Sequence, residues 1–514
     1  MNVRRRWGAA SAVLVAISLV AGACSAGTSP SASGTSQASG PSASNGGVLR
    51  VGTSTDLLTL DLPNYVSAQD LLVGAQIFDT LVEYDSNLKI VPGLAVSWNQ
   101  TDSTTWVFNL RHGVVFSDGE PFDAAAVKAS IDRARTGQGQ SHYLNMIASV
   151  DATSQYVVTF HLIQPFAPFL NYLAFGPASI EAPQSLGPTA AMARKPVGTG
   201  PFELKSWTGS TVVLQRNPKY WGTPPLLDGV QFQYIANDSS REAALEAGEV
   251  DVIQNVPPAD FASLKSKSLA ILTPYAQTFW LGFTAGTNPA LDNPQVRKAI
   301  AMAIDRHTIV TQVTEGLTRE ATGGFLPPEL GIQPAQELPY DVTQAKQLLA
   351  EAGYPTGFSA TLTTPIGRYL KDVEISQVIQ AELAQIGITV TIDQLEYAGY
   401  AAKMESHQAQ MFVLGWQMTP SPDPFFTAVF KSTSSADWSN YKNPTIDSEL
   451  TQAEAAPSKQ QADQIYAQID QQLINDVAGV PIYYSNSLIG VSPKVHNLVV
   501  DPEGHFLLGK ASVS

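Results

Sequence analysis

The stretch TTWVFNLRHGVVFSDGEPFDAAAVKASIDRA, residues 104–134, carries the clearest fold signal in this chain of 514 residues. Trp106 and Phe108 alternate with their neighbours in a two-residue period, which predicts a strand with one buried face. Gly119 follows in a Ser-Asp-Gly turn, where glycine adopts a positive φ without strain. Asp123 then stands at the N-cap of a predicted helix. A strand, a turn and a capped helix in this order are typical of α/β proteins.

The same stretch resembles the signature segment of the family 5 solute-binding proteins of ABC importers, which include dipeptide-, oligopeptide- and nickel-binding members. That signature combines an aromatic strand, Leu-Arg, an aromatic residue, Ser-Asp-Gly-x-Pro-Phe and a helix start. Three further segments resemble motifs of the family, in the family's order: Gly-Thr-Gly-Pro-Phe at 198–202, Arg-Asn-Pro-Lys-Tyr-Trp at 216–221 and Ala-Gly-Glu-Val-Asp-Val at 247–252. The resemblance covers nearly all of the chain from Val48 onwards.

This resemblance implies an α/β, two-lobed periplasmic-binding-protein fold of type II, with two crossing strands between the lobes and the ligand in the cleft. It also implies an extra subdomain in lobe one. The expected boundaries are 48–278 plus 488–514 for lobe one, about 85–188 for its inserted subdomain, and 279–487 for lobe two. The strands predicted at Thr278–Thr284 and Pro481–Tyr484 are the expected crossings.

Helical spacing and capping residues predict helices between these motifs. Asn293 is a predicted N-cap, with Pro294 at the first helical position. Residues Asp372–Ile386 form an amphipathic segment that stops at a glycine, and Ser458–Asn475 is the last long helix. We also expect a helix over Asp70–Tyr84.

Length and charge limit the function classes. A chain of 514 residues buries a large core and should form two or more lobes. Only 15% of the residues are charged, which suits a folded globular protein. The formal net charge of −15 argues against nucleic acid or an anionic lipid surface as a direct partner. We expect a monomer.

The N-terminus predicts export. A basic start at Arg4–Arg6 precedes an apolar run at Ala9–Ala23, which is too short to span a bilayer comfortably. The run ends in Ala-Gly-Ala-Cys, which resembles a lipobox although Ala21 stands where leucine is usual. Cys24 is the only cysteine, so we expect a signal peptide at 1–23, lipidation of Cys24 and anchoring at the extracytoplasmic face of the cell membrane. The alternative is an unmodified cysteine in a discarded signal peptide.

Residues 24–47 are rich in Ser, Gly, Ala and Thr and cannot bury enough apolar surface to fold. We therefore expect a flexible tether between the lipid anchor and the folded part. Such a tether is what a surface-held binding protein requires, and a permissive linker is the alternative.

We find no enzymatic constellation and expect no catalytic residue, cofactor or metal. The seven histidines show no short metal-ligand spacing, and no cysteine besides Cys24 exists. Residues 86–89 match the Ser-x-x-Lys of penicillin-binding enzymes, but neither partner motif follows. Residues 504–511 approach a P-loop but carry Ala511 where the metal-binding hydroxyl is needed. A cell-wall enzyme and a pure surface sensor remain the alternatives from other functional classes.

The stretch 410–430, QMFVLGWQMTPSPDPFFTAVF, is the most informative for the ligand. In peptide-binding members of the family, the loop after the tryptophan faces the cleft, and an aspartate three residues beyond it holds the peptide's amino group. Thr419 occupies that position here, and a neutral hydroxyl cannot offset the lost hydration of a buried ammonium group as a carboxylate would. Asp423 is a candidate substitute for that aspartate, or else part of a structural turn.

Further candidate ligand-binding residues are aromatic or adjoin this loop. Trp416 offers a large face for stacking on a ligand, and Gln417 and Met418 follow it. Trp280 and Tyr484 lie on the proposed crossing strands, where they line the cleft floor or pack in the core.

The expected function is that of a solute receptor that closes its lobes on a small polar ligand and delivers it to the permease and ATPase subunits of an ABC importer. A peptide is the favoured ligand. The threonine at position 419 leaves an oligosaccharide, a blocked peptide, an opine-like compound or a metal chelate as alternatives.

Overall fold

The computed structural model describes residues 46–65, 67–136, 141–187, 192–418, 421–434 and 436–514. These residues belong to one compact unit, Ala43–Ser514. The predicted signal peptide, Cys24 and all but the last two residues of the predicted tether lie outside the described residues, as does Thr419. In the described ranges, no helix is both long and apolar enough to cross a membrane.

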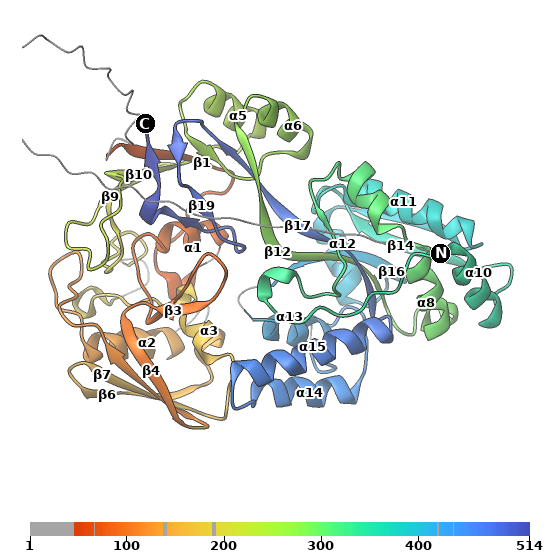
Figure 1. Ribbon diagram of the computed structural model, residues 1–514, viewed down its shortest axis with the longest axis horizontal. Helices are drawn as coiled ribbons and strands as arrows, with labels where there is room; N and C mark the ends of the chain where they lie inside the picture. Colours follow the sequence, from red (N-terminus) through yellow and green to blue (C-terminus); the bar gives the residue numbers. More distant parts are fainter. Residues whose placement is uncertain (1–45, 66, 137–140, 188–191, 419–420, 435) are drawn as a thin grey trace, which may run out of the picture. The chain divides into compact units, whose positions relative to one another are not determined.

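A mixed sheet of 11 strands organises the chain (Figure 1). Its main path has ten strands, and β13 (Arg319–Glu320) pairs with β17 off this path. In spatial order the path is β15 (Thr389–Leu395), β14 (Ser359–Pro365), β16 (Met411–Gln417), β12 (Ala270–Phe283), β17 (Gly479–Val491), β11 (Val252–Ile253), β1 (Val48–Thr53), β10 (Gly229–Tyr234), β9 (Thr211–Arg216) and β8 (Phe202–Thr208).

The two long strands β12 and β17 run antiparallel at the centre of this sheet, as Figure 1 shows. Beyond β12 the sheet continues into β16, and beyond β17 it continues into β11. Both predicted crossing strands are therefore present, and each is longer than the sequence indicated. The two-lobed α/β fold is confirmed, and we keep the predicted boundaries to name the first and second lobes.

Residues 104–134 form the elements that their sequence predicts. Strand β5 (Thr105–Leu110) buries Phe108, and helix α2 (Ala124–Thr136) follows. Oδ1 of Asp123 accepts hydrogen bonds from the backbone N–H groups of the next helical turn, and Gly119 has a φ of 101°. Strand β5 belongs to a separate four-stranded sheet within the predicted insertion, in the order β4 (Ala95–Asp102), β5, β7 (Val157–Leu162) and β6 (Ile147–Ser154).

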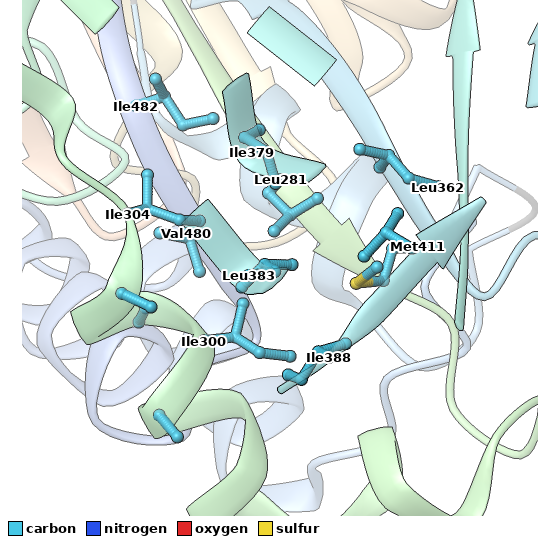
Figure 2. Packing of buried hydrophobic residues seen from close by; sticks show 14 of the residues in the cluster. Leu281, Ile300, Ile304, Leu362, Ile379, Leu383, Ile388, Met411, Val480 and Ile482 are labelled. Carbon is cyan, nitrogen blue, oxygen red and sulfur yellow. The ribbon is translucent and has the colours of Figure 1, made fainter. Parts of the chain in front are cut away.

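Hydrophobic cores lie on the faces of these sheets. In the second lobe, Leu281 of β12 and Met411 of β16 pack with the helices α8 (Pro294–Ala303) and α11 (Asp372–Gln385), as Figure 2 shows. The remaining long helices of the second lobe are α10 (Val342–Glu351), α12 (Tyr397–Glu405), α13 (Asp423–Phe430), α14 (Pro444–Glu454) and α15 (Lys459–Asn475).

The helix predicted over Asp70–Tyr84 is wrong in its second half. The observed helix α1 spans Ala68–Gly74, and Ser67 and Asp70 form a reciprocal capping box at its start. The chain then turns into the short strand β2 (Val82–Tyr84). The carboxylate of Asp70 also accepts the backbone N–H groups of Leu58 and Thr59, so tertiary contacts fix the start of this helix.

Candidate functional site

Asp423 is the candidate residue with the most specific surroundings. It begins α13 and is 5% exposed. Its Oδ2 accepts a hydrogen bond of 3.2 Å from the hydroxyl of Tyr172, on helix α3 (Phe169–Leu173) of the first lobe. Its Oδ1 accepts a bond of 3.1 Å from Tyr466 on α15. Both carboxylate oxygens are thus occupied by protein groups, and the carboxylate connects the two lobes.

Burial raises the pKa of Asp423 to about 7, and the nearby charge of Glu454 adds to this effect. The two tyrosine hydroxyls act in the opposite direction because they stabilise the carboxylate. The side chain therefore titrates near neutral pH rather than in the acid range usual for aspartate.

The predicted loop residues lie at the end of β16. Trp416 is half-buried and packs against Phe425, with ring centroids 6.4 Å apart. Gln417 is also half-buried, and its side-chain amide donates to the backbone oxygen of Glu503 at 3.4 Å. Met418 is fully buried, and its backbone N–H donates to Ala276.

The two candidates on the crossing strands are enclosed by protein. Trp280 is 1% exposed and meets Phe325 and Phe425 edge to face. The hydroxyl of Tyr484 accepts a hydrogen bond from the backbone N–H of Gly323 and donates one to the carbonyl oxygen of Gly324. The core-packing alternative thus accounts for the position of both side chains, whose role in ligand binding stays a prediction.

A cavity of about 300 Å³ lies in the first lobe. Apolar side chains such as Leu71, Phe78 and Phe175 form part of its wall, and Tyr84 and Tyr220 add aromatic rings with hydroxyls. Pockets of this kind, mostly apolar with a few polar groups, are typical of small-molecule sites. The cavity is lined by residues from both ends of the first lobe in the sequence, 62–223 and 501–509.

Two carboxylates enter the cavity from the segment that contains β2. Oδ2 of Asp79 accepts hydrogen bonds from the hydroxyl of Thr199 at 2.8 Å and from the indole N–H of Trp221 at 2.7 Å. Burial raises the pKa of Asp79 despite these bonds. Burial, with the Asp79 charge as a second cause, raises the pKa of Glu83 to about 8.

A turn near the C-terminus brings three more titratable side chains to the cavity: Asp501, Glu503 and His505. Oδ1 of Asp501 accepts the backbone N–H groups of Glu503 and His505, which fixes the turn. The imidazole Nδ1 of His505 lies 3.2 Å from Oδ2 of Asp501 and 3.5 Å from Oε2 of Glu503. Burial lowers the pKa of His505, but the Asp501 carboxylate outweighs it and raises this pKa to about 9.

The predicted loop and the cavity wall meet at this turn. The backbone N–H of Ala276 on β12 donates to Pro502, and the carbonyl oxygen of Ala276 accepts from Met418. The side chain of Gln417 also donates to Glu503, whose own side chain lines the cavity. These three bonds connect the end of β16 with the cavity wall.

Sequence reasoning missed Asp79, Glu83 and the turn at 501–505. These carboxylates lie near the two ends of the folded chain, so no local sequence spacing predicts that they share a site. The tertiary fold brings them together: the side-chain amide of Gln76, which precedes Asp79, donates to the carbonyl oxygen of Phe506, which follows the turn. The one available signal was the Asp-Pro-x-Gly sequence at 501–504, which is typical of a turn.

Comparison with known proteins shows related chains throughout the folded part. The sequence profile described as "Bacterial extracellular solute-binding proteins, family 5 Middle" matches residues 89–438. The glutathione-binding protein GsiB of Salmonella paratyphi A is 28% identical over 483 residues, which cover 90% of this chain and 94% of that protein.

Solved structures agree with this similarity. HbpA2 from Haemophilus parasuis is 25% identical with a TM-score of 0.82, over 91% of this chain and 100% of that one. The periplasmic binding protein DppA from Helicobacter pylori, in complex with the peptide STSA, is 27% identical with a TM-score of 0.69, over 91% of this chain and 98% of that one.

Proposed function

Because this chain belongs to the bacterial extracellular solute-binding proteins of family 5, we propose that it captures a small peptide outside the cytoplasm and delivers it to an ABC importer. Proteins of this family work with the permease and ATPase subunits of such importers. The relatives described above are named for binding glutathione, itself a small peptide, or were solved with a peptide bound. They are binding proteins for transport rather than enzymes.

The observation that carries the proposal is the cavity of about 300 Å³ in the first lobe. Its wall combines apolar and aromatic surface with carboxylates, so it accommodates a ligand that has both apolar and charged parts. The wall is also linked to the second lobe through the contact between Gln417 and Glu503. Binding in the cavity is therefore in a position to affect how the lobes meet.

The N-terminal part of the proposal concerns attachment to the membrane. We propose lipidation of Cys24 and tethering of the folded part through residues 24–47. Labelling cells with a fatty-acid analogue tests this directly. We expect label on the wild-type protein and none on Cys24→Ala, which should appear in the soluble extracytoplasmic fraction. Equal labelling of both proteins would contradict lipidation at this position.

A thermal-shift panel tests the ligand class. It contains free peptides of two to five residues and glutathione, the N-acetylated forms of the same peptides, oligosaccharides and metal chelates. A ligand at 100 times its dissociation constant stabilises a protein by about 2.7 kcal/mol, enough to raise the melting temperature by a few degrees.

We expect free peptides to raise the melting temperature. A shift with free peptides but not with acetylated ones reveals an amine-binding group. If only sugars or chelates raise the melting temperature, the peptide assignment is wrong while the solute-binding role stands. If no compound does, the proposed function loses its support.

A further inference from the structure

The side chain of Glu503 has an unusual position. It is only 4% exposed, and it lines the first-lobe cavity. Its Oε2 faces the imidazole of His505 at 3.5 Å. Within the described part of the chain, its Oε1 is buried and has no hydrogen-bond partner. Burying a carboxylate oxygen without a hydrogen-bond partner costs free energy. A ligand group that donates a hydrogen bond to this oxygen would remove that cost.

The cavity is lined by more acidic than basic side chains. Asp79, Glu83, Asp501 and Glu503 line it, and among the described lining residues His505 is the only basic side chain. Arg111 is outside the lining: its guanidinium donates to the carbonyl oxygen of Gly93 and stacks over the ring of Trp221, and its charge acts on Asp79 and Glu83. Among the described lining residues, no side-chain cation is therefore bonded to Oε1 of Glu503, whereas His505 faces the other oxygen, Oε2.

We propose that this cavity binds the cationic group of the captured ligand, an ammonium or a guanidinium, with Glu503 as its main carboxylate partner. This inference rests on the proposed solute-binding function and names the substrate class more narrowly. A charge-assisted hydrogen bond to a buried carboxylate is stronger than one between neutral groups, and it specifies the ligand. The tyrosine rings of the wall suit the same chemistry, because cations are attracted to aromatic faces.

The alternative amine-binding residue, Asp423, is less suited to this role. Both of its oxygens already accept tyrosine hydroxyls, whereas Glu503 keeps one oxygen without a partner in the described structure. Burial also raises the pKa of Glu503 to about 7, although the positive charge of His505 acts in the opposite direction. An incoming cation stabilises the carboxylate form and removes that penalty.

A metal ion is the competing occupant. Asp501, Glu503 and His505 offer three donor atoms within 4.8 Å of one another. However, a metal ligand must be a neutral imidazole, and here two carboxylates hold His505 in its charged form. An organic cation binds at the remaining oxygen of Glu503 without displacing that proton.

Isothermal titration with matched ligands tests the proposal. The peptides Ala-Lys-Ala and Ala-Arg-Ala are compared with Ala-norleucine-Ala and Ala-citrulline-Ala, which replace each cation by a neutral group of similar length. Agmatine, a small guanidinium compound, probes the cavity without a peptide backbone. Zn²⁺ alone is titrated in parallel. The protein variants are Glu503→Gln and, as a matched control, Glu405→Gln, which alters an exposed carboxylate of the second lobe.

We expect the cationic peptides to bind at least about ten-fold more tightly than their neutral partners, which corresponds to about 1.4 kcal/mol. The preference should disappear in Glu503→Gln and persist in Glu405→Gln. Equal affinity for cationic and neutral peptides in the wild type overturns the cation site while the peptide-binding function stands.

Two further outcomes separate this proposal from the function on which it rests. If no peptide binds, the titration with agmatine tests the cation site by itself. Agmatine binding that is lost in Glu503→Gln supports the site. A wild-type protein that does not bind agmatine overturns it. The wild type could instead bind Zn²⁺ and lose this binding in both Glu503→Gln and His505→Ala. If it also shows no preference for cationic peptides, the cavity is a metal site and the proposal is overturned.

Discussion

The hydroxyl of Tyr172 in the first lobe donates a hydrogen bond of 3.2 Å to Oδ2 of Asp423 in the second lobe. Tyr466, which belongs to the second lobe, binds the other oxygen of the same carboxylate. A second contact lies close by, where the backbone N–H of Ala167 donates to the carbonyl oxygen of Glu454 at 2.6 Å. Asp423 is therefore the buried acceptor of one side-chain hydrogen bond between the lobes, and a backbone bond between Ala167 and Glu454 accompanies it.

The variant Tyr172→Phe should weaken this contact between the lobes. It removes one hydrogen bond to a charged group, worth about 1.5–3 kcal/mol, and leaves the ring in place. We expect the radius of gyration measured by small-angle X-ray scattering to increase. Tyr466→Phe is the matched control, because it removes a bond to the same carboxylate within the second lobe. It should lower the melting temperature and leave the radius of gyration unchanged. Identical scattering of all three proteins would contradict a role for Tyr172 in holding the lobes together.

Stability should fall as the pH rises through neutrality, and Asp423 should contribute to this fall. Its pKa is about 7 in the folded state and about 3.9 in an unfolded chain, so the folded state holds the proton more tightly. The resulting stabilisation is fully present below about pH 4 and is lost as the pH rises through 7. Glu83 and Glu503 act in the same direction, because burial raises their pKa values to about 8 and about 7.

Urea unfolding at pH 5.5 and pH 8 measures this effect. We expect the free energy of unfolding of the wild type to fall by at least about 1 kcal/mol more than that of Asp423→Asn, whose side chain does not titrate. A wild type that is more stable at pH 8 than at pH 5.5, or an equal fall in both proteins, would show that Asp423 does not carry a raised pKa.

The variant Tyr484→Phe distinguishes core packing from ligand contact. It leaves the backbone N–H of Gly323 without its acceptor, so we expect a loss of about 1–3 kcal/mol in the free energy of unfolding. The thermal shift caused by any ligand found in the panel should stay the same. A variant with wild-type stability that no longer responds to the ligand would instead place Tyr484 in the ligand site, as the sequence first suggested.

Asp470 should be essential for the second lobe. It is fully buried on α15 and accepts the backbone N–H groups of Phe325 and Leu326. Its replacement by alanine leaves two buried donors unpaired, at a cost of about 1–3 kcal/mol for each. We expect Asp470→Ala to lower the free energy of unfolding by several kcal/mol. Asp463→Ala, which breaks a more exposed ion pair with Lys459 on the same helix, should change it by about 1 kcal/mol or less.

Local signals in the sequence were sufficient for much of the fold. Asp123 and Asn293 cap helices as predicted, because the N-cap preference acts within a few residues. The helix expected over Asp70–Tyr84 stops early, since contacts with distant residues override spacing there. Tyr172 could not be connected with Asp423 from sequence, because 251 positions separate them. For the same reason the cavity carboxylates became visible only in the folded structure.

Native mass spectrometry of the protein with a peptide mixture tests whether the protein captures peptides. The purified protein is incubated with a protease digest of a common protein, separated from unbound material and measured under native and denaturing conditions. We expect bound masses that match peptides of a narrow length range, enriched in lysine or arginine and released on denaturation. A protein that carries no peptide after exposure to this mixture, while it binds a sugar or a metal chelate, would contradict the assignment to peptide capture.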